Sequence, residues 1–314
     1  MVAVEIPSLV LKSSTAQRRM PVIGMGSAPD FACKRDTREA IIEAIKQGYR
    51  HFDTAAAYGS EQALGEAIKE AIEVGLVSRE ELFVTSKLWC TDNHPHLVAS
   101  ALRKSLRTLQ LEYLDLYLIH WPICAKPGKF SFPIDAEELM PLNLKGIWGA
   151  MEECQRLGLA KAIGVSNFSI KKLESLLSFA TIPPAVNQVE MNLAWQQKNL
   201  RDFCKANDII ITAFSPLRKG ASRGPNEAMD NDVVKDIADA HGKSSAQVCL
   251  RWLYEQGVTF VPKSYNKERM NQNLQIFDWS LTEEDYEKIS QIKQQRLISG
   301  PTKPQLKDLY DEEN

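Results

Sequence analysis

The sequence lacks the features that mark membrane, exported and disulfide-bonded proteins. Nowhere in its 314 residues does an apolar run approach the roughly 18 residues that a membrane helix needs. The N-terminus has no basic region followed by a long apolar run, so we expect no secretory signal. The six cysteines are scattered without a C-x-x-C pair, which argues against a disulfide framework or a zinc site. These absences favour a cytoplasmic protein with reduced thiols and no association with a membrane.

Other absences concern ligands. The formal net charge is only -2, so no affinity for nucleic acid or another polyanion is expected. No G-x-G-x-x-G fingerprint follows a predicted strand, so a Rossmann-type cofactor site is not supported. The histidines at 94 and 96 flank a proline, but two histidines at a helix start are typical of capping and surface groups. We therefore expect no metal site.

What the sequence does contain is a regular alternation of short apolar segments and helical segments. After a hairpin expected over residues 5–20, we predict strands at residues 22–25, 49–52, 82–86, 114–119, 160–165, 185–189, 209–214 and 258–261. Helices are predicted at residues 36–47, 61–74, 95–109, 144–157, 170–179, 198–206, 232–240, 245–256 and 267–272. Alternation favours a parallel sheet, and eight units close a (β/α)8 TIM barrel. We expect one α/β domain over residues 1–314.

Three parts of the chain are not needed to close such a barrel. Two are long connections at residues 121–142 and 215–229, after the fourth and seventh predicted strands. Loops of that length are usually functional, and both would lie on the face where the strands end. The third part is an extra helix at residues 282–292 with a polar C-terminal extension.

Four residues capable of acid–base chemistry stand at three consecutive strand ends. Asp53 ends the second predicted strand and Tyr58 follows five residues later, just before a helix start. Lys87 ends the third strand, and His120 ends the fourth. The strand ends of a β/α barrel converge on one mouth, where such residues are typically catalytic. We therefore expect these four side chains to lie together.

The four residue types suit the protonation of an oxygen atom on which negative charge develops. A free phenol, with a pKa of roughly 10, is a poor acid at neutral pH, and the ammonium of Lys87 is expected to lower that pKa. Asp53 would keep Lys87 protonated, and His120 would orient a substrate carbonyl. That is half of a carbonyl reduction, and a cofactor must bring the hydride. Taken singly, Asp53 is as typical of a turn and Lys87 of the surface, while His120 and Tyr58 are more typical of the core.

Several longer motifs resemble those of the aldo-keto reductase superfamily over essentially the whole chain. They stand at residues 48–55 with 58–59, 118–122, 163–168, 187–190, and 261–264 followed by 269. The resemblance implies a (β/α)8 barrel, a monomer as the usual form, and NADPH bound across the strand ends. Carried over by position, it implies that Asp53, Tyr58, Lys87 and His120 form the catalytic tetrad.

The same resemblance implies a set of cofactor contacts. Ser166, Asn167 and Gln188 would bond the nicotinamide carboxamide. The pyrophosphate would lie at Ser215 and Leu217, the 2′-phosphate at Lys263, Ser264 and Arg269, and the adenine near Gln272 and Asn273. The remaining expected contacts are Gly26, Ser27, Asp53 and Phe214. Two cations flanking a hydroxyl suit a phosphate monoester better than a ribose hydroxyl; the alternative is a pair of surface charges at a helix start.

Two departures from the family pattern bear on the substrate. Phe214 stands where the family often has a tyrosine, so stacking on the nicotinamide should survive without the hydroxyl. Ala28, followed by Pro29, stands where aldehyde reductases commonly have a tryptophan, so we expect a wider pocket and a bulkier substrate. The expected substrate contacts are Ala28, Pro29, Tyr58, His120 and Trp121. Trp121 could equally be core filler.

Within the superfamily, residues 22–31, 217–226 and 298–304 are most similar to the plant polyketide reductases of legumes, the chalcone reductases. That resemblance implies reduction of one ketone on a coumaroyl polyketide intermediate of chalcone synthase, giving a 6′-deoxychalcone (isoliquiritigenin) in flavonoid biosynthesis. It leaves a transient association with the synthase open. Two alternative functions are considered: a broad plant carbonyl or alkaloid-ketone reductase, and a non-catalytic NADPH-sensing subunit. The intact tetrad argues against the second.

Overall fold

The structure is a computed structural model that describes residues 5–28, 37–128, 130–218, 226–306 and 308–311. The predicted substrate contact Pro29 and the expected helix start at Asp36 lie outside the described residues. Within them, no helix combines the length and the apolar character that crossing a membrane requires.

Eight parallel strands form the centre of the molecule, and each pairs with the next along the chain. A parallel bridge between Ile23 and Phe260 joins the first strand to the last and closes the barrel. The predicted fold class is therefore confirmed. The strands are β3 (Met25–Gly26), β4 (His51–Asp53), β5 (Phe83–Leu88), β6 (Leu116–Ile119), β10 (Ile163–Ser166), β11 (Val186–Glu190), β12 (Ile210–Phe214) and β13 (Thr259–Phe260).

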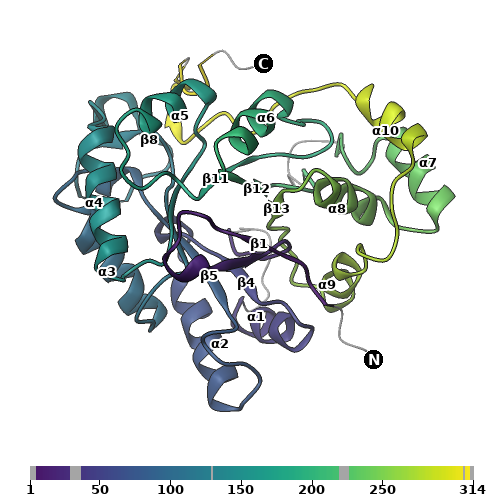
Figure 1. The fold of residues 1–314 in the computed structure, drawn as a ribbon, viewed down its shortest axis with the longest axis horizontal. Helices are drawn as coiled ribbons and strands as arrows, with labels where there is room; N and C mark the ends of the chain where they lie inside the picture. Colours follow the sequence, from purple (N-terminus) through teal and green to yellow (C-terminus); the bar gives the residue numbers. More distant parts are fainter. Residues whose placement is uncertain (1–4, 29–36, 129, 219–225, 307, 312–314) are drawn as a thin grey trace.

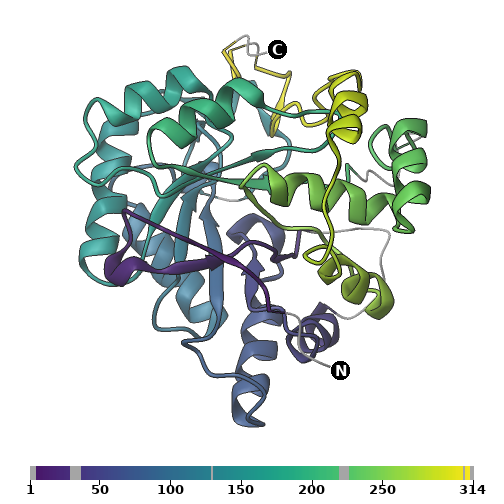
Figure 2. The ribbon, with the colours of Figure 1, turned by 45° about the vertical axis from the view of Figure 1, so that its right-hand side comes forward.

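The helices surround these strands (Figures 1 and 2). In α2, apolar residues three and four positions apart, such as Leu64, Ala67, Ile68 and Ala71, are buried and turn one face of the helix to the core. The helices are α1 (Thr37–Lys46), α2 (Glu61–Glu73), α3 (Val98–Leu109), α4 (Leu144–Arg156), α5 (Ile170–Leu177), α6 (Lys198–Ala206), α7 (Asp232–His241), α8 (Ser245–Glu255), α9 (Lys267–Leu274) and α10 (Glu283–Ser290).

The predicted N-terminal hairpin is present as β1 (Ser8–Val10) and β2 (Arg19–Pro21), with the short 3-10 helix η1 (Thr15–Gln17) in its turn. Buried Leu11 and Met20 pack with the first residues of three barrel strands, Phe83, Leu116 and Val186. The hairpin therefore closes the end of the barrel at which the strands begin. It leaves the opposite end, where the predicted site residues lie, to the loops.

The connection at residues 121–142 is more ordered than the loop that the sequence suggested. It contains β7 (Cys124–Ala125), which pairs with β9 (Leu139–Met140), and the 3-10 helix η4 (Ala136–Glu138). Between them, β8 (Ile134–Asp135) pairs with β14 (Thr302–Lys303) of the C-terminal extension. The extension therefore does not trail into solvent as a polar tail but is tied to the loop that follows β6.

Several predicted boundaries differ from the structure by one to three residues, and two of them have a local cause. The helix predicted from residue 95 begins at Val98, because the carbonyl of His94 turns the chain by accepting from the amides of Leu97 and Val98 at 2.8 and 3.3 Å. The 3-10 helix η3 (Cys90–Asp92) comes before that turn. The strand predicted at residues 22–25 is assigned only at its end, as β3, because Ile23 makes a single bridge rather than a ladder.

Candidate active site

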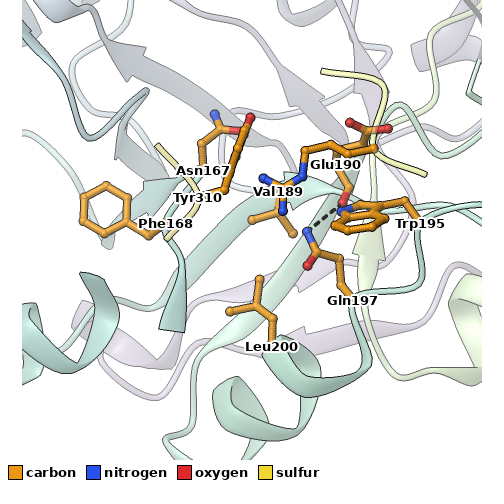
Figure 3. Close-up of a pocket in the computed structure, with 9 residues that line it drawn as sticks. Asn167, Phe168, Val189, Glu190, Trp195, Gln197, Leu200 and Tyr310 are labelled. Atoms are coloured by element: carbon orange, nitrogen blue, oxygen red, sulfur yellow. Dashed lines mark hydrogen bonds between the residues drawn. The ribbon is translucent and has the colours of Figure 1, made fainter. Parts of the chain in front are cut away.

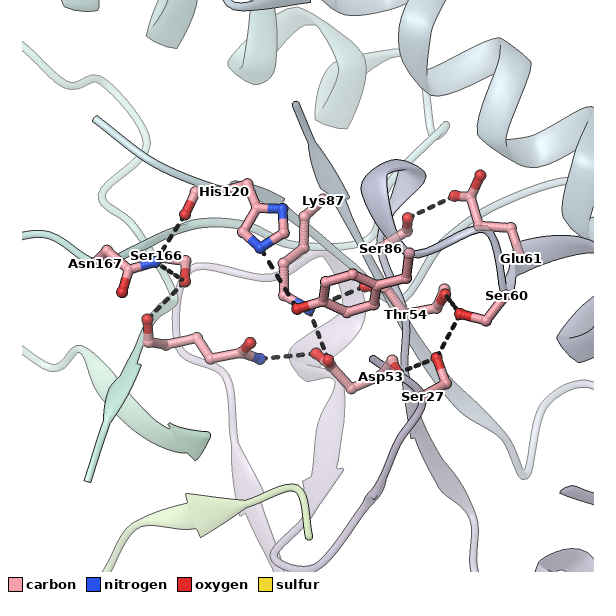
Figure 4. A network of polar contacts seen from close by, with 12 residues as sticks. Ser27, Asp53, Thr54, Ser60, Glu61, Ser86, Lys87, His120, Ser166 and Asn167 are labelled. Atoms are coloured by element: carbon pink, nitrogen blue, oxygen red, sulfur yellow. Dashed lines mark hydrogen bonds and ion pairs between the residues drawn. The ribbon is translucent and has the colours of Figure 1, made fainter. Parts of the chain in front are cut away.

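Three of the four predicted catalytic residues extend from neighbouring strands at the mouth of the barrel. Asp53 is the last residue of β4, Lys87 lies near the end of β5, and His120 follows β6 directly. The Lys87 ammonium lies 2.6 Å from a carboxylate oxygen of Asp53 and donates to the carbonyl of Thr54 at 2.9 Å (Figure 4). Both members of this ion pair are almost wholly buried.

Tyr58 comes from the 3-10 helix η2 (Ala56–Tyr58), which ends at Gly59 in the left-handed region with φ 68°. The backbone of glycine enters this region without strain, so the chain can reverse immediately after the tyrosine. The Tyr58 hydroxyl lies 3.5 Å from Lys87 Nζ and 3.4 Å from His120 Nε2. The structure thus brings together all four residues that the sequence singled out.

Burial and charge set the protonation of this cluster. Burial raises the pKa of Tyr58, and the Lys87 ammonium opposes that rise without reversing it. The lowering by Lys87 that the sequence predicts is present, but burial outweighs it and the net pKa is raised. Burial would lower the pKa of Lys87, but Asp53 and Tyr58 outweigh it and the pKa is raised. Burial, then Lys87, lowers the pKa of His120 well below its ordinary value. At neutral pH the site holds a phenol, an ammonium and a neutral imidazole.

The three residues predicted to bind a carboxamide lie on the next strands of the barrel. Gln188, on β11, donates from its amide nitrogen to the second carboxylate oxygen of Asp53 at 2.7 Å. Ser166, at the end of β10, donates to the Gln188 carbonyl at 2.7 Å. The Asn167 amide donates to the His120 carbonyl at 2.9 Å. All three side chains are buried, and Figure 4 shows Ser166 and Asn167 beside His120.

The predicted phosphate-binding residues gather at the start of α9. Lys263 and Ser264 lie in the segment between β13 and α9, and Arg269 is exposed in the first turn of that helix. Lys263 Nζ donates to the Ala28 carbonyl at 2.7 Å, next to the end of β3. A helix N-terminus favours anions, and Lys263 and Arg269 add two cations near the start of α9. Of the predicted adenine contacts, Gln272 is exposed and Asn273 is buried.

The other predicted cofactor residues border the same end of the barrel. At Gly26 a β-carbon would lie 2.8 Å from the Val261 carbonyl, so only glycine lets β3 approach the segment after β13. Phe214 ends β12 and is half-buried. Ser215, with φ 48°, begins the long loop after that strand, and Leu217 packs against the core. Residues 219–225 of this loop lie outside the described part of the chain.

An aromatic wall, which we define as Trp89, Trp121, Phe130 and Phe132, stands beside His120. The rings of Trp89 and Trp121 lie 5.3 and 6.2 Å from the His120 ring, centroid to centroid. Phe130 and Phe132 lie 5.3 and 6.4 Å from Trp89 and are exposed. Of these four, only Trp121 was predicted. Trp89 could have been found, because residues two apart on a strand share a face and Trp89 follows Lys87 by two.

A small pocket lies next to the mouth, between the ends of β10 and β11 and the C-terminal extension (Figure 3). Its lining includes Asn167, Glu190, Trp195, Arg296 and Tyr310. The Arg296 guanidinium lies 3.4 Å from the centroid of the Tyr310 ring and 4.8 Å from that of Trp195. The contact with Trp195 holds the extension against the barrel, and the contact with Tyr310 lies within the extension.

A buried carboxylate fastens the same segment. Glu190 accepts from the amides of Leu297 and Ile298 at 3.0 and 2.7 Å. Beyond them, Leu309 joins a buried cluster with Trp89 and Trp121. The C-terminal extension is therefore a part of the site that the sequence did not reveal.

His94, the first of the two histidines that flank Pro95, contacts the segment that follows β6. His94 Nε2 lies 2.9 Å from the Ala125 carbonyl and 3.6 Å from Cys124 Sγ. Across the described ranges, no group of three or more His, Cys, Asp or Glu residues could hold a metal ion.

With this geometry established, the comparisons with known proteins decide the family. A family model described as "Aldo/keto reductase family" matches residues 22–294. This chain belongs to the aldo/keto reductase family. An aldo/keto reductase neighbour of known structure, the aldose reductase from Schistosoma japonicum, matches with a TM-score of 0.87 at 32% identity. The match covers 96% of this chain and 98% of that one.

Two plant relatives in the aldo/keto reductase family are more similar in sequence. The "NAD(P)H-dependent 6'-deoxychalcone synthase" of Glycine max is 78% identical over 311 residues, 99% of each chain. The "NADPH-dependent codeinone reductase 1-4" of Papaver somniferum is 56% identical over 299 residues, 94% of this chain and 92% of that protein. The family match ends at residue 294, so the segment that fastens the C-terminal extension and packs on the aromatic wall lies beyond the matched region.

Proposed function

We propose that this aldo/keto reductase uses NADPH to reduce one ketone of a coumaroyl polyketide intermediate made by chalcone synthase. Ring closure, loss of water and aromatisation then leave a 6′-deoxychalcone (isoliquiritigenin). The observation that carries the chemistry is the position of the Tyr58 hydroxyl, 3.5 Å from Lys87 Nζ and 3.4 Å from His120 Nε2. The 78% identity with the Glycine max 6'-deoxychalcone synthase supports the substrate.

In this proposal a substrate carbonyl oxygen lies within hydrogen-bond distance of both the Tyr58 hydroxyl and His120 Nε2, which are themselves 3.4 Å apart. NADPH supplies a hydride to the carbonyl carbon when it is bound. As negative charge develops on the oxygen, Tyr58 transfers its proton, so that the carbonyl becomes an alcohol. Lys87 stabilises the resulting phenolate, and Asp53 holds Lys87 in place and protonated. Neutral His120 donates a hydrogen bond that orients the carbonyl without competing as an acid.

The residues present fit NADPH. Amide and hydroxyl groups of Ser166, Asn167 and Gln188 suit the donors and acceptor of a nicotinamide carboxamide, and Asp53 lies beside them. A cation in the first turn of a helix is unfavourable by itself, but it is favourable where a phosphate lies against it. We therefore assign Lys263, Ser264 and Arg269 to the 2′-phosphate. The other contacts assigned to the cofactor are Gly26, Ser27, Phe214, Ser215, Leu217, Gln272 and Asn273.

The proposed substrate site is the space beside the tetrad, with Ala28 on one side and the aromatic wall on the other. Small Ala28 removes bulk at the end of β3, and aromatic rings suit the coumaroyl group by stacking. We further propose that the chain acts as a single-domain, cytoplasmic monomer that takes its substrate from chalcone synthase during a transient association. The surface that would contact the synthase is not assigned.

The test is a product analysis with chalcone synthase, coumaroyl-CoA, malonyl-CoA and NADPH. The deoxychalcone should form alongside the ordinary hydroxylated chalcone. It should vanish with Tyr58→Phe, while NADPH still quenches the protein fluorescence of the variant. If Tyr58→Phe keeps its activity, the assignment of the proton donor is wrong.

A second candidate function is a broad plant carbonyl or alkaloid-ketone reductase, favoured by the 56% identity with the codeinone reductase. In that case only the ordinary chalcone would form in the coupled assay, while simple ketones or alkaloid ketones are reduced. A non-catalytic NADPH-sensing subunit would bind the cofactor and reduce neither class of substrate.

A further inference from the structure

Three buried hydroxyl groups next to the tetrad form a closed chain that no catalytic role explains. They belong to Ser27 at the end of β3, Thr54 after β4, and Ser60 before α2 (Figure 4). Ser60 Oγ lies 2.8 Å from Ser27 Oγ and 2.9 Å from Thr54 Oγ1. Ser27 Oγ donates to the Asp53 carbonyl at 2.9 Å.

The direction of every hydrogen bond in this chain is fixed. A hydroxyl has one hydrogen, and that of Ser27 is committed to the Asp53 carbonyl, which can only accept. Ser60 must therefore donate to Ser27, and Thr54 must donate to Ser60. The chain begins on Thr54 and ends on Asp53, the residue before it, so it closes a ring around the peptide that joins the two. In a series of hydrogen bonds that all run in one direction, each bond polarises and strengthens its neighbours.

This ring lies beside the three groups that contact the Lys87 ammonium among the described residues. The Asp53 carboxylate and the Thr54 carbonyl belong to the two residues that the encircled peptide joins. The third group is the Tyr58 hydroxyl, and Tyr58 precedes Ser60 by two residues in the sequence. Ser60 is the one member of the ring that contacts both other hydroxyls.

A second observation sets Ser60 apart from an ordinary helix cap. It occupies the N-cap position of α2, where serine normally accepts from a backbone amide of the first turn. Its backbone is helical there (φ -97°, ψ -5°), and its side chain makes no capping bond. By contrast, Ser169 and Ser244 have extended backbone and cap α5 and α8. The Ser60 hydroxyl is turned inward to the ring, so α2 forgoes its cap.

We propose that Ser60 is a positioning residue for the reduction: its hydroxyl holds Tyr58, Asp53 and Thr54 at their distances from Lys87. The proposal rests on the proposed roles of Tyr58 and Lys87. A residue that supported only the fold would affect all steps alike. Loss of the Ser60 hydroxyl should instead slow the chemical step more than it weakens cofactor binding.

The experiment measures the single-turnover rate constant of hydride transfer to a simple ketone, with the NADPH Kd and the Tm of each variant. Ser60→Ala leaves the Thr54 hydroxyl without an acceptor and should lower the rate constant by about 10- to 100-fold, since small misplacements of reacting groups have effects of that size. The NADPH Kd should change less than the rate constant. Ser60→Thr keeps the hydroxyl and should restore most of the rate.

Thr54→Val should have a smaller effect than Ser60→Ala, because Ser60 can still donate to Ser27 and no hydroxyl hydrogen is left unpaired. If Ser60→Ala does not fold, Thr54→Val carries the test, and an unchanged rate overturns the proposal. The matched control is Thr212→Val, which breaks a buried hydroxyl pair with Thr259 (2.7 Å) within β12 and β13.

The proposal fails if Ser60→Ala keeps the wild-type rate constant, or if Thr212→Val slows hydride transfer as much. Tyr58→Phe separates this failure from failure of the proposed function. An inactive Tyr58→Phe with a fully active Ser60→Ala removes only the positioning role. An active Tyr58→Phe instead removes the proton donor on which the role rests.

Discussion

Replacing Lys87 with methionine tests the ion pair at the centre of the site. Lys87 is wholly buried, with its ammonium 2.6 Å from Asp53. Methionine has a similar length and removes the charge without removing the stem. The Asp53 carboxylate then remains buried with the Gln188 amide as its remaining side-chain donor among the described residues. Removing one partner of a buried ion pair typically costs about 3–5 kcal/mol.

We therefore expect Lys87→Met to lower the free energy of unfolding by about 3–5 kcal/mol, a large part of the roughly 5–15 kcal/mol typical of a native domain. It should also abolish reduction, because no ammonium stabilises the phenolate of Tyr58. Adding Asp53→Asn removes the stranded charge and should recover part of the stability but none of the activity. The control Lys198→Met, at an exposed helical pair with Asp202, should stay within about 0.5 kcal/mol.

Urea unfolding followed by circular dichroism measures these differences, and pH adds a second check. The raised pKa of Lys87 means that its stabilisation is complete below the ordinary lysine value of 10.5 and is lost as pH rises through the higher folded pKa. The stability difference between wild type and Lys87→Met should therefore shrink only above pH 10.5. A cost below about 1 kcal/mol, or no recovery on adding Asp53→Asn, would refute the reasoning.

Three further predictions concern the cofactor, the substrate and pH. Arg269→Met should raise the KM for NADPH by about tenfold or more and leave that for NADH nearly unchanged, since it removes one charge-assisted contact to the 2′-phosphate; equal effects on both cofactors would contradict the assignment. Trp89→Ala should lower kcat/KM for aromatic ketones more than for aliphatic ketones in steady-state assays. An equal loss of kcat/KM for both classes would contradict the assignment of the aromatic wall to the substrate site. The raised pKa of Tyr58 and the lowered pKa of His120 predict a hydride-transfer rate that is flat between pH 6.5 and 10.0, and an inflection inside that range would argue against one of the two directions.

The sequence predicted the barrel and the tetrad because both follow from local pattern. Apolar runs define the strands, and parallel strands in a barrel deliver their last residues to one mouth. Asp53, Lys87 and His120 are each at or beside such an end, so their convergence needed no knowledge of loop structure. Tyr58 lies outside a strand, and its place depended on the left-handed turn at Gly59.

The direction of the Tyr58 pKa shift could not be predicted from residue types. The residue types reveal the neighbouring ammonium, which lowers the pKa of a phenol. They do not reveal that the hydroxyl is shielded from water, which raises that pKa. In the structure, burial outweighs the charge. The raised pKa keeps the Tyr58 hydroxyl protonated at neutral pH, as the proposed proton donor must be before negative charge develops on the substrate oxygen.

The C-terminal part of the site escaped prediction for a different reason, since it depends on contacts between distant segments. The extension reaches the aromatic wall only because β14 pairs with β8 and because Glu190 binds the amides of Leu297 and Ile298. Neither contact leaves a periodic trace in the sequence. The barrel can therefore be shared with an aldose reductase at 32% identity, while the C-terminal extension is fastened through β14, Leu297 and Ile298, which lie outside the eight barrel strands. In the proposed function, substrate choice is expected to vary with this extension without disturbing the tetrad.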